Sequence, residues 1–221
     1  MSGIRYSGDR SAGKESPMNI VLTGFEPFGL ESMNPSWEAV RALPDQIGPA
    51  TIIRYCLPVE YRAVRPKLLE ILRTHQPYAM ICVGQAGGRA MITPERIAIN
   101  LMDARSADES GYLAEEEPIR SGGPDAYFSG LPIRSMVSRM QAQGIPAAPS
   151  LSAGTFVCNC TMYHLMDLIA HEGMHTKGGF VHLPYLPQQA AEKPSPDPSM
   201  ALETMIQGLL CCVESVLPDN V

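Results

Sequence analysis

The stretch Tyr78-Ala-Met-Ile-Cys-Val-Gly84 is a continuous apolar run that leads into the glycine-rich segment Gly84-Gln-Ala-Gly-Gly88. An apolar run of this length between turn signals is typical of a central strand in a parallel sheet, whose two faces are covered by helices. This stretch therefore predicts an α/β fold.

The neighbouring segments follow the same plan, because strand-like and helix-like patterns alternate along the chain. Asn34-Pro35 has the chemistry of a helix start, with an N-cap side chain followed by proline in the first turn. The predicted strands are 19–23, 51–57, 78–84, 96–101, 145–151 and 179–183. The predicted helices are 35–43, 61–74, 133–143, 158–170 and 198–216. This order predicts a single-domain, three-layer α/β/α architecture with a twisted, mostly parallel (mixed) central sheet.

Two segments fall outside this alternation. Residues 1–17 are polar and contain no apolar core of a secretory signal, so we expect a disordered extension, an upstream start or an added tail, followed by one domain over 18–221. Residues 103–130 are polar and include three consecutive glutamates, 115–117. A loop of this length is expected to be mobile or functional, as a flap or an oligomer contact.

Composition excludes several classes of protein. The net charge of −6 over 221 residues gives no basic footprint, so nucleic acid is not an expected partner. No apolar run approaches the length of a membrane span. The six cysteines show neither the paired spacing of a zinc site nor a disulfide framework, which favours a reducing, cytoplasmic location.

Cys158 is the cysteine whose position suggests chemistry. It opens the predicted helix 158–170, where unpaired backbone N–H groups and the helix dipole would stabilise a thiolate. Cys160 lies two residues further on and should face nearly the opposite side of the helix. The other four (Cys56, Cys82, Cys211 and Cys212) lie in apolar strand or helix patterns and are interpreted as packing. Because most free cysteines are core residues, packing stays an alternative for Cys158 as well.

Two further side chains could reach the same place. In open α/β sheets, functional groups gather beyond the carboxyl ends of the strands. His182 lies near the end of the predicted strand 179–183, and Glu95 follows the glycine-rich exit of the strand 78–84. With Cys158 they would supply a nucleophile, a base and an acidic group that orients the base. The alternatives are a core histidine at 182 and a surface ion pair between Glu95 and Arg96.

Other patterns carry less weight. The glycine-rich segment 84–88 lacks both the Lys-Ser/Thr of a P-loop and the spacing of a dinucleotide-binding turn. His164, His171 and His175 are predicted to be exposed helix and turn residues without the geometry of a metal site.

Four sets of residues, in this order, together resemble pyroglutamyl-peptidase I, the cytosolic pyrrolidone-carboxylate cysteine peptidases. The first is Leu22-Thr-Gly-Phe-Glu-Pro-Phe-Gly29 with Asn34-Pro-Ser-Trp37, and the second is Val83-Gly-Gln-Ala-Gly-Gly-Arg89. The third is Ile92-Thr-Pro-Glu-Arg-Ile-Ala-Ile-Asn-Leu101. The fourth is Ser152-Ala-Gly-Thr-Phe-Val-Cys-Asn159 with Gly178-Gly-Phe-Val-His-Leu-Pro184. The resemblance extends from Met18 to about residue 216.

The resemblance implies a cysteine exopeptidase that hydrolyses the amide bond after an N-terminal pyroglutamyl residue through a thioester acyl-enzyme. It implies that Cys158 is the nucleophile, His182 the general base and acid, and Glu95 the group that orients His182. The residues that it places in the substrate pocket are Phe25, Phe28, Asn34, Gln85, Phe156 and Val157. It implies neither a metal nor an organic cofactor, and it suggests a homo-oligomer, a dimer or tetramer.

Two positions depart from the family pattern. Leu30 stands where a second glycine is frequent, and Cys160 where some members have histidine; neither belongs to the expected triad. Two other functions stay open at this point: a related thiol amidase acting on another cyclic or capped amide, and an inert α/β binding protein. Retention of Cys158, His182 and Glu95 together argues against the second.

Overall fold

The computed structural model of the chain describes residues 18–195 and 197–218, so the expectation for residues 1–17 lies outside the described part. Its main sheet contains β1 (Met18–Phe25), β2 (Gln46–Ile47), β3 (Ala50–Leu57), β4 (Ala79–Gln85), β5 (Thr93–Pro94) and β8 (Lys177–Leu183). The spatial order is β2-β3-β1-β4-β8-β5. The four inner strands are parallel, and the short edge strands β2 and β5 are antiparallel to their neighbours. The predicted mixed, mostly parallel sheet is therefore confirmed.

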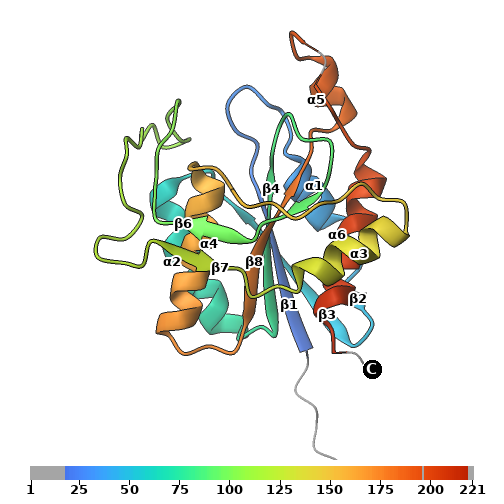
Figure 1. The fold of residues 1–221 in the computed structure, drawn as a ribbon, viewed down its shortest axis with the longest axis horizontal. Coiled ribbons are helices and arrows are strands. Elements are labelled where there is room, and N and C mark those ends of the chain that lie inside the picture. Colours follow the sequence, from blue (N-terminus) through green and yellow to red (C-terminus); the bar gives the residue numbers. More distant parts are fainter. Residues whose placement is uncertain (1–17, 196, 219–221) are drawn as a thin grey trace, which may run out of the picture.

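Helices cover both faces of this sheet (Figure 1). They are α1 (Pro35–Arg41), α2 (Tyr61–His75), α3 (Ile133–Ala142), α4 (Val157–His171), the short α5 (Pro187–Ala191) and α6 (Leu202–Val216). Residues of α1, α3 and α6 belong to one buried apolar cluster, and residues of α2 and α4 belong to the other. Alternate residues of β1 divide between the clusters, with Ile20 and Leu22 in the first and Val21 in the second, as strand geometry requires.

Several local predictions are confirmed. The apolar run at 78–84 forms β4, which pairs with β1 on one side and with β8 on the other. Asn34 caps α1, because its Oδ1 accepts a hydrogen bond from the backbone N–H of Ser36 at 3.1 Å. The apolar face predicted for the second helix is buried in α2, as Val64 and Leu68 show with no exposed surface.

The strand predicted over 145–151 is wrong. This segment is extended but forms only isolated bridges, from Ala147 to Ile92 and from Ser150 to Glu95. Four backbone hydrogen bonds join it to residues 92–96, but Pro94 on that partner segment has no N–H group to donate, so the pairing is interrupted between the two bridges.

The strand predicted over 96–101 is shorter and lies elsewhere. It forms β6 (Ile97–Ile99), which pairs outside the main sheet with β7 (Ala126–Phe128). The last helix begins at Leu202 instead of residue 198, and the sequence did not predict β2, β5, β7 or α5.

The C-terminal part of the polar segment 103–130 is attached to α4 by hydrogen bonds. Asp167 is almost fully buried, and it accepts hydrogen bonds from Arg120 at 2.5 Å and from the Tyr127 hydroxyl at 2.8 Å. A buried carboxylate needs such partners, so this contact fixes the segment against the helix.

Within the described residues, none of the helices combines the length and the apolar character that crossing a bilayer demands.

Candidate active site

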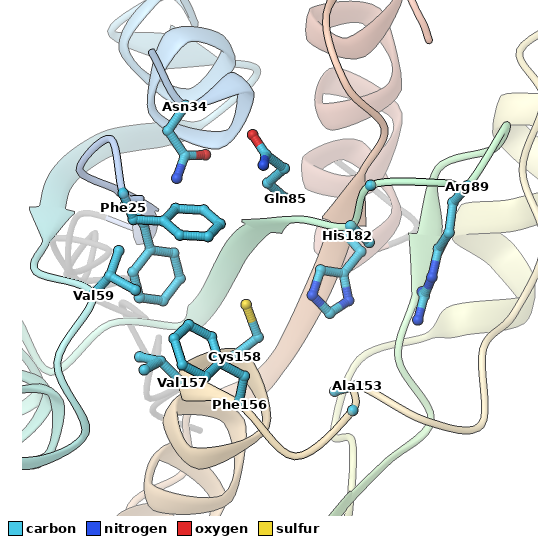
Figure 2. Close-up of a pocket in the computed structure, with 14 residues that line it drawn as sticks. Phe25, Asn34, Val59, Gln85, Arg89, Ala153, Phe156, Val157, Cys158 and His182 are labelled. Carbon is cyan, nitrogen blue, oxygen red and sulfur yellow. The ribbon is translucent and has the colours of Figure 1, made fainter. Parts of the chain in front are cut away.

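A cavity of about 260 Å³ opens at the carboxyl ends of β1, β4 and β8 (Figure 2). Every residue that the sequence predicted for the site lines it, except Glu95, which lies behind His182. The lining residues are Phe25, Phe28, Asn34, Val59, Gln85, Ala86, Gly87, Arg89, Ala153, Gly154, Phe156, Val157, Cys158 and His182. The fold thus gathers residues from separate connections at one edge of the sheet, as expected for an open α/β sheet.

Cys158 is the second residue of α4, and its side chain extends over β4. A Cβ atom on Gly84 would lie 2.9 Å from the sulfur, so the missing side chain at this position makes room for the thiol. Gly84 is also the register partner of His182 on the adjacent strand. The sulfur and the imidazole ring therefore flank the same glycine, and Figure 2 shows both at the cavity.

Glu95 and His182 form a buried pair. Nδ1 of His182 lies 2.7 Å from Oε1 of Glu95, and the two residues are 3% and 0% exposed. Glu95 follows β5 directly, and its backbone N–H donates to the carbonyl oxygen of Phe180 on β8 at 2.9 Å, which holds the carboxylate beside His182. The alternative of a surface ion pair between Glu95 and Arg96 is therefore wrong.

Arg89 is a charged residue of the site that the sequence analysis did not predict. Its Nη1 donates to the same Oε1 of Glu95 at 2.7 Å, and its Nη2 donates to the carbonyl oxygen of Ser152 at 2.9 Å. It therefore links the carboxylate to the loop before α4. In the sequence, the only indication of this role was the position of Arg89 directly after the glycine-rich segment 84–88. An arginine at that position is equally consistent with an exposed surface cation.

Burial and charge set the protonation of the three groups. Burial lowers the pKa of His182 below its ordinary value; the hydrogen bond and charge of Glu95 oppose this shift, and the charge of Arg89 adds to it. Burial alone would raise the pKa of Glu95, but hydrogen bonds from His182 and Arg89 outweigh it and hold the carboxyl ionised. The neutral imidazole thus donates from Nδ1 and keeps Nε2 free to accept a proton.

The thiol of Cys158 differs from the sequence-based expectation. Burial and the negative charge of Glu95 raise its pKa to about 12, against a smaller opposing effect of Arg89 and of the backbone N–H at the helix start. The sequence predicted that the helix start would stabilise a thiolate, whereas the net shift in the pKa of Cys158 favours the neutral thiol.

Aromatic rings form one wall of the cavity. The rings of Phe28 and Phe156 lie 6.4 Å apart between centroids, and Tyr61 packs edge-on against Phe156 at 5.5 Å. Phe25 adds a third ring to the lining. Flat apolar faces at this spacing can enclose a small ring of a ligand.

Two amide side chains, those of Asn34 and Gln85, also belong to the lining and lie on the side of Phe25 away from Phe156 (Figure 2). Asn34 is largely committed to structure: its Oδ1 also accepts from the Ser36 hydroxyl at 2.8 Å, and its Nδ2 donates to the backbone oxygen of Glu26 at 3.0 Å. The side-chain amide of Gln85 therefore has more hydrogen-bonding capacity left for a ligand than that of Asn34.

Two other sequence predictions have clear outcomes. Cys160 faces away from the cavity and is fully buried among apolar side chains, as predicted. The expected exposure of His164 is wrong: it is 8% exposed, and its Nδ1 has no hydrogen-bond partner in the described structure. His171 and His175 are exposed, as predicted.

Comparisons with known proteins agree with this geometry. The pyroglutamyl peptidase family matches residues 18–219. The pyrrolidone-carboxylate peptidase of Thermococcus onnurineus is 50% identical over 200 residues, covering 90% of this chain and 99% of that protein. The counterpart in Bacillus velezensis is 50% identical over 203 residues, covering 91% and 94%.

Solved structures extend the similarity to the fold. Pyroglutamyl peptidase I from Bacillus amyloliquefaciens superposes with a TM-score of 0.87 at 45% identity, covering 92% of this chain and 97% of that chain. A variant of the pyrrolidone carboxyl peptidase of Pyrococcus furiosus gives 0.88 at 38% identity, covering 92% and 100%. The likeness thus spans nearly the whole described chain, including the strand ends and the helix start that form the cavity. The chain belongs to the pyroglutamyl peptidase family of hydrolases.

Proposed function

We propose that this protein removes an N-terminal 5-oxoprolyl (pyroglutamyl) residue from peptides, with Cys158 as nucleophile, His182 as general base and acid, and Glu95 orienting His182. The observation that carries the proposal is the 2.7 Å contact between His182 and Glu95 beneath a cavity that Cys158 also lines. This contact fixes the imidazole tautomer and leaves Nε2 on the side where a thiol proton can be accepted.

The first half of the reaction forms an acyl-enzyme. Nε2 of His182 takes the proton of the Cys158 thiol while the sulfur attacks the carbonyl carbon that links the lactam residue to the next residue. The first turn of α4 has backbone N–H groups without helical acceptors, which can stabilise the oxyanion of the tetrahedral intermediate. The imidazolium, stabilised by Glu95, then gives its proton to the leaving amine, and the C–N bond breaks.

The second half restores the enzyme. His182 takes a proton from water, and the hydroxide attacks the thioester that joins the acyl group to Cys158. Collapse of this second tetrahedral intermediate breaks the C–S bond, and His182 returns its proton to the sulfur as pyroglutamate leaves.

The charge of the lining supports a blocked N-terminal residue as the group that binds. Neither aspartate nor glutamate is among the described residues that line the cavity, so a free ammonium group would be buried there without a counter-ion. The lactam of a 5-oxoprolyl group is uncharged, and its flat ring suits the phenylalanine wall. At about 260 Å³, the cavity is also close to the lower end of the usual size of ligand pockets.

A pyroglutamyl-amide assay with thiol alkylation tests this function. We expect release of the amine from the pyroglutamyl amide, no appreciable release from prolyl or alanyl amides, and loss of turnover when the modified cysteine maps to Cys158. Failure to cleave the pyroglutamyl amide, together with cleavage of another cyclic or capped amide, would point to a related thiol amidase instead.

For the assembly we propose a homo-oligomer, a dimer or tetramer, in the cytoplasm, by analogy with the family. The six free cysteines agree with a reducing compartment. Light scattering of the purified protein would measure the mass of the assembly; a monomer at every concentration tested would reject this part of the proposal.

A further inference from the structure

Gln189 is a buried polar residue next to the cavity that the sequence analysis did not single out. It lies on the short helix α5 and is 3% exposed. Its side-chain nitrogen Nε2 lies 2.9 Å from Oε1 of Gln85, which lines the cavity. Gln189 itself does not line the cavity, so any effect on a ligand must pass through Gln85.

The orientation of the Gln189 amide is fixed by partners that can act in only one way. Its Oε1 lies 3.0 Å from the backbone N–H of Leu186, which can only donate. Its Nε2 lies 3.0 Å from the carboxylate of Glu31 and 3.3 Å from the carbonyl oxygen of Met33, which can only accept. Reversing the amide would oppose donor to donor and acceptor to acceptor, so the nitrogen must face Glu31.

This orientation determines that of Gln85. The two hydrogens of the Gln189 amide nitrogen go to its two nearest acceptors, Oε1 of Gln85 at 2.9 Å and the carboxylate of Glu31 at 3.0 Å, so Gln85 turns its carbonyl oxygen toward Gln189. The amide nitrogen of Gln85, with its two hydrogens, then points away from Gln189. Since Gln85 borders the cavity (Figure 2), the group left to meet a ligand there is a donor.

Glu31, the second acceptor of the Gln189 amide nitrogen, has a cationic partner of its own. It forms an ion pair with Lys193, just beyond α5, and its side chain is only 13% exposed. The chain from Lys193 through Glu31 and Gln189 to Gln85 therefore connects α5, the loop after β1 and the end of β4.

We propose that Gln189 is a specificity-determining positioning residue: it locks the amide of Gln85 so that the pocket presents an N–H donor to the ring carbonyl of the 5-oxoprolyl group. This inference rests on the proposed function. A rotated Gln85 would oppose its own oxygen to the lactam oxygen, and two acceptors facing each other in a pocket repel. The lock therefore favours substrates that carry the ring carbonyl.

Gln189→Met tests the lock, because methionine has a similar volume and no donor. We expect KM for the pyroglutamyl amide to rise about 10-fold with kcat changed by less than about threefold, the loss of one oriented hydrogen bond. The matched control is Gln188→Met, an exposed glutamine on the same helix, for which KM should be unchanged. An unchanged KM in Gln189→Met would overturn the inference.

A double-mutant cycle separates positioning from general support of the fold. If Gln189 acts only through Gln85, the pair Gln85→Leu and Gln189→Met should raise KM no further than Gln85→Leu alone. Multiplicative effects of the two substitutions would reject the mechanism. Absence of any pyroglutamyl-amide hydrolysis by the unmodified protein would instead contradict the proposed function, so the two failures are distinguishable.

The unmodified protein offers an independent measurement, should Gln189→Met fail to fold. The side-chain amide signals of Gln85 in a ¹⁵N-labelled sample, identified by their loss in Gln85→Leu, should shift when 2-pyrrolidinone is added. Shifts confined to other glutamines would overturn the proposed orientation.

Discussion

Nδ1 of His182 and Nη1 of Arg89 both lie 2.7 Å from a single oxygen, Oε1 of Glu95. The buried carboxylate therefore binds two cations, Arg89 and the imidazolium, when His182 is protonated. When His182 is neutral, it binds Arg89 and an uncharged N–H donor. Because Arg89 always carries its charge, Glu95 stays ionised in both states, which is the condition for stabilising an imidazolium during turnover.

Glu95→Gln should lower kcat by a factor on the order of 10² to 10⁴ and leave some activity, since the amide oxygen can still orient His182 but has no charge to stabilise the imidazolium. Steady-state kinetics on a pyroglutamyl amide measure this. Glu115→Gln is the control, because Glu115 is exposed and remote from the cavity lining. Full activity of Glu95→Gln would remove Glu95 from the mechanism.

Cys158→Ala should abolish hydrolysis, whereas Cys160→Ala should retain it and lose about 1 kcal/mol of unfolding free energy through a small cavity. The two thiols differ in place: one lines the cavity, and the other is buried in the core two residues away. Turnover and urea unfolding of both variants make the comparison. Hydrolysis that persists undiminished in Cys158→Ala would refute the nucleophile assignment.

Arg89→Met should shift the pH profile of kcat/KM toward higher pH. The positive charge of Arg89 lowers the pKa of His182 and opposes the rise in the pKa of Cys158. Without it both values rise, so the imidazole becomes neutral, and able to accept the thiol proton, only at higher pH. Arg89→Lys, which keeps a charge near the carboxylate, should shift the acid limb less. An acid limb that moves to lower pH would contradict the assignment.

The sequence predicted the central layers well because their signals are local. The apolar run of β4 and the apolar face of α2 are properties of neighbouring residues, and both appear as predicted. The segment 145–151 failed as a strand because its pairing partner, residues 92–96, contains Pro94, which has no N–H group to donate between the two bridges. The position of β6 outside the main sheet depends on pairing with β7, almost thirty residues away, and no local pattern encodes that choice.

The sequence predicted those residues of the candidate site that belong to recognisable motifs. Cys158, His182 and Glu95 lie at strand and helix ends that a parallel sheet brings together. Arg89 and Gln189 were not predicted, because their roles arise from contacts across the fold. Gln189 lies 104 residues from Gln85 in the chain, and its burial follows from a short helix that has no strong periodicity of its own.

His164 should make the protein sensitive to acid. Burial, with the nearby charge of Arg65, lowers its pKa to about 4 from the ordinary 6.5, while Asp167 opposes the shift. The unfolded chain therefore binds a proton between these values that the folded chain does not, so stability falls as pH falls from 6.5 toward 4, by about 3 kcal/mol at most. In urea unfolding, His164→Leu should lose less stability than the unmodified protein over this range, whereas His175→Leu, at an exposed position, should match it. Equal losses in all three proteins would reject the role of His164.

Gly84→Ala should impair both catalysis and folding. The added Cβ would lie 2.9 Å from the sulfur of Cys158 and 2.7 Å from the ring of Phe180, and contacts this short force a neighbour to move. Moving the thiol relieves only one of these contacts, so the ring of Phe180, which is buried in the core, must shift as well. A displacement near 1 Å of a nucleophile costs on the order of 10² in rate, so kcat/KM should fall by about that factor. Urea unfolding of the same sample should show a loss of about 1 to 3 kcal/mol, the usual cost of overpacking a core; an unchanged kcat/KM would show that the sulfur does not need its place over Gly84.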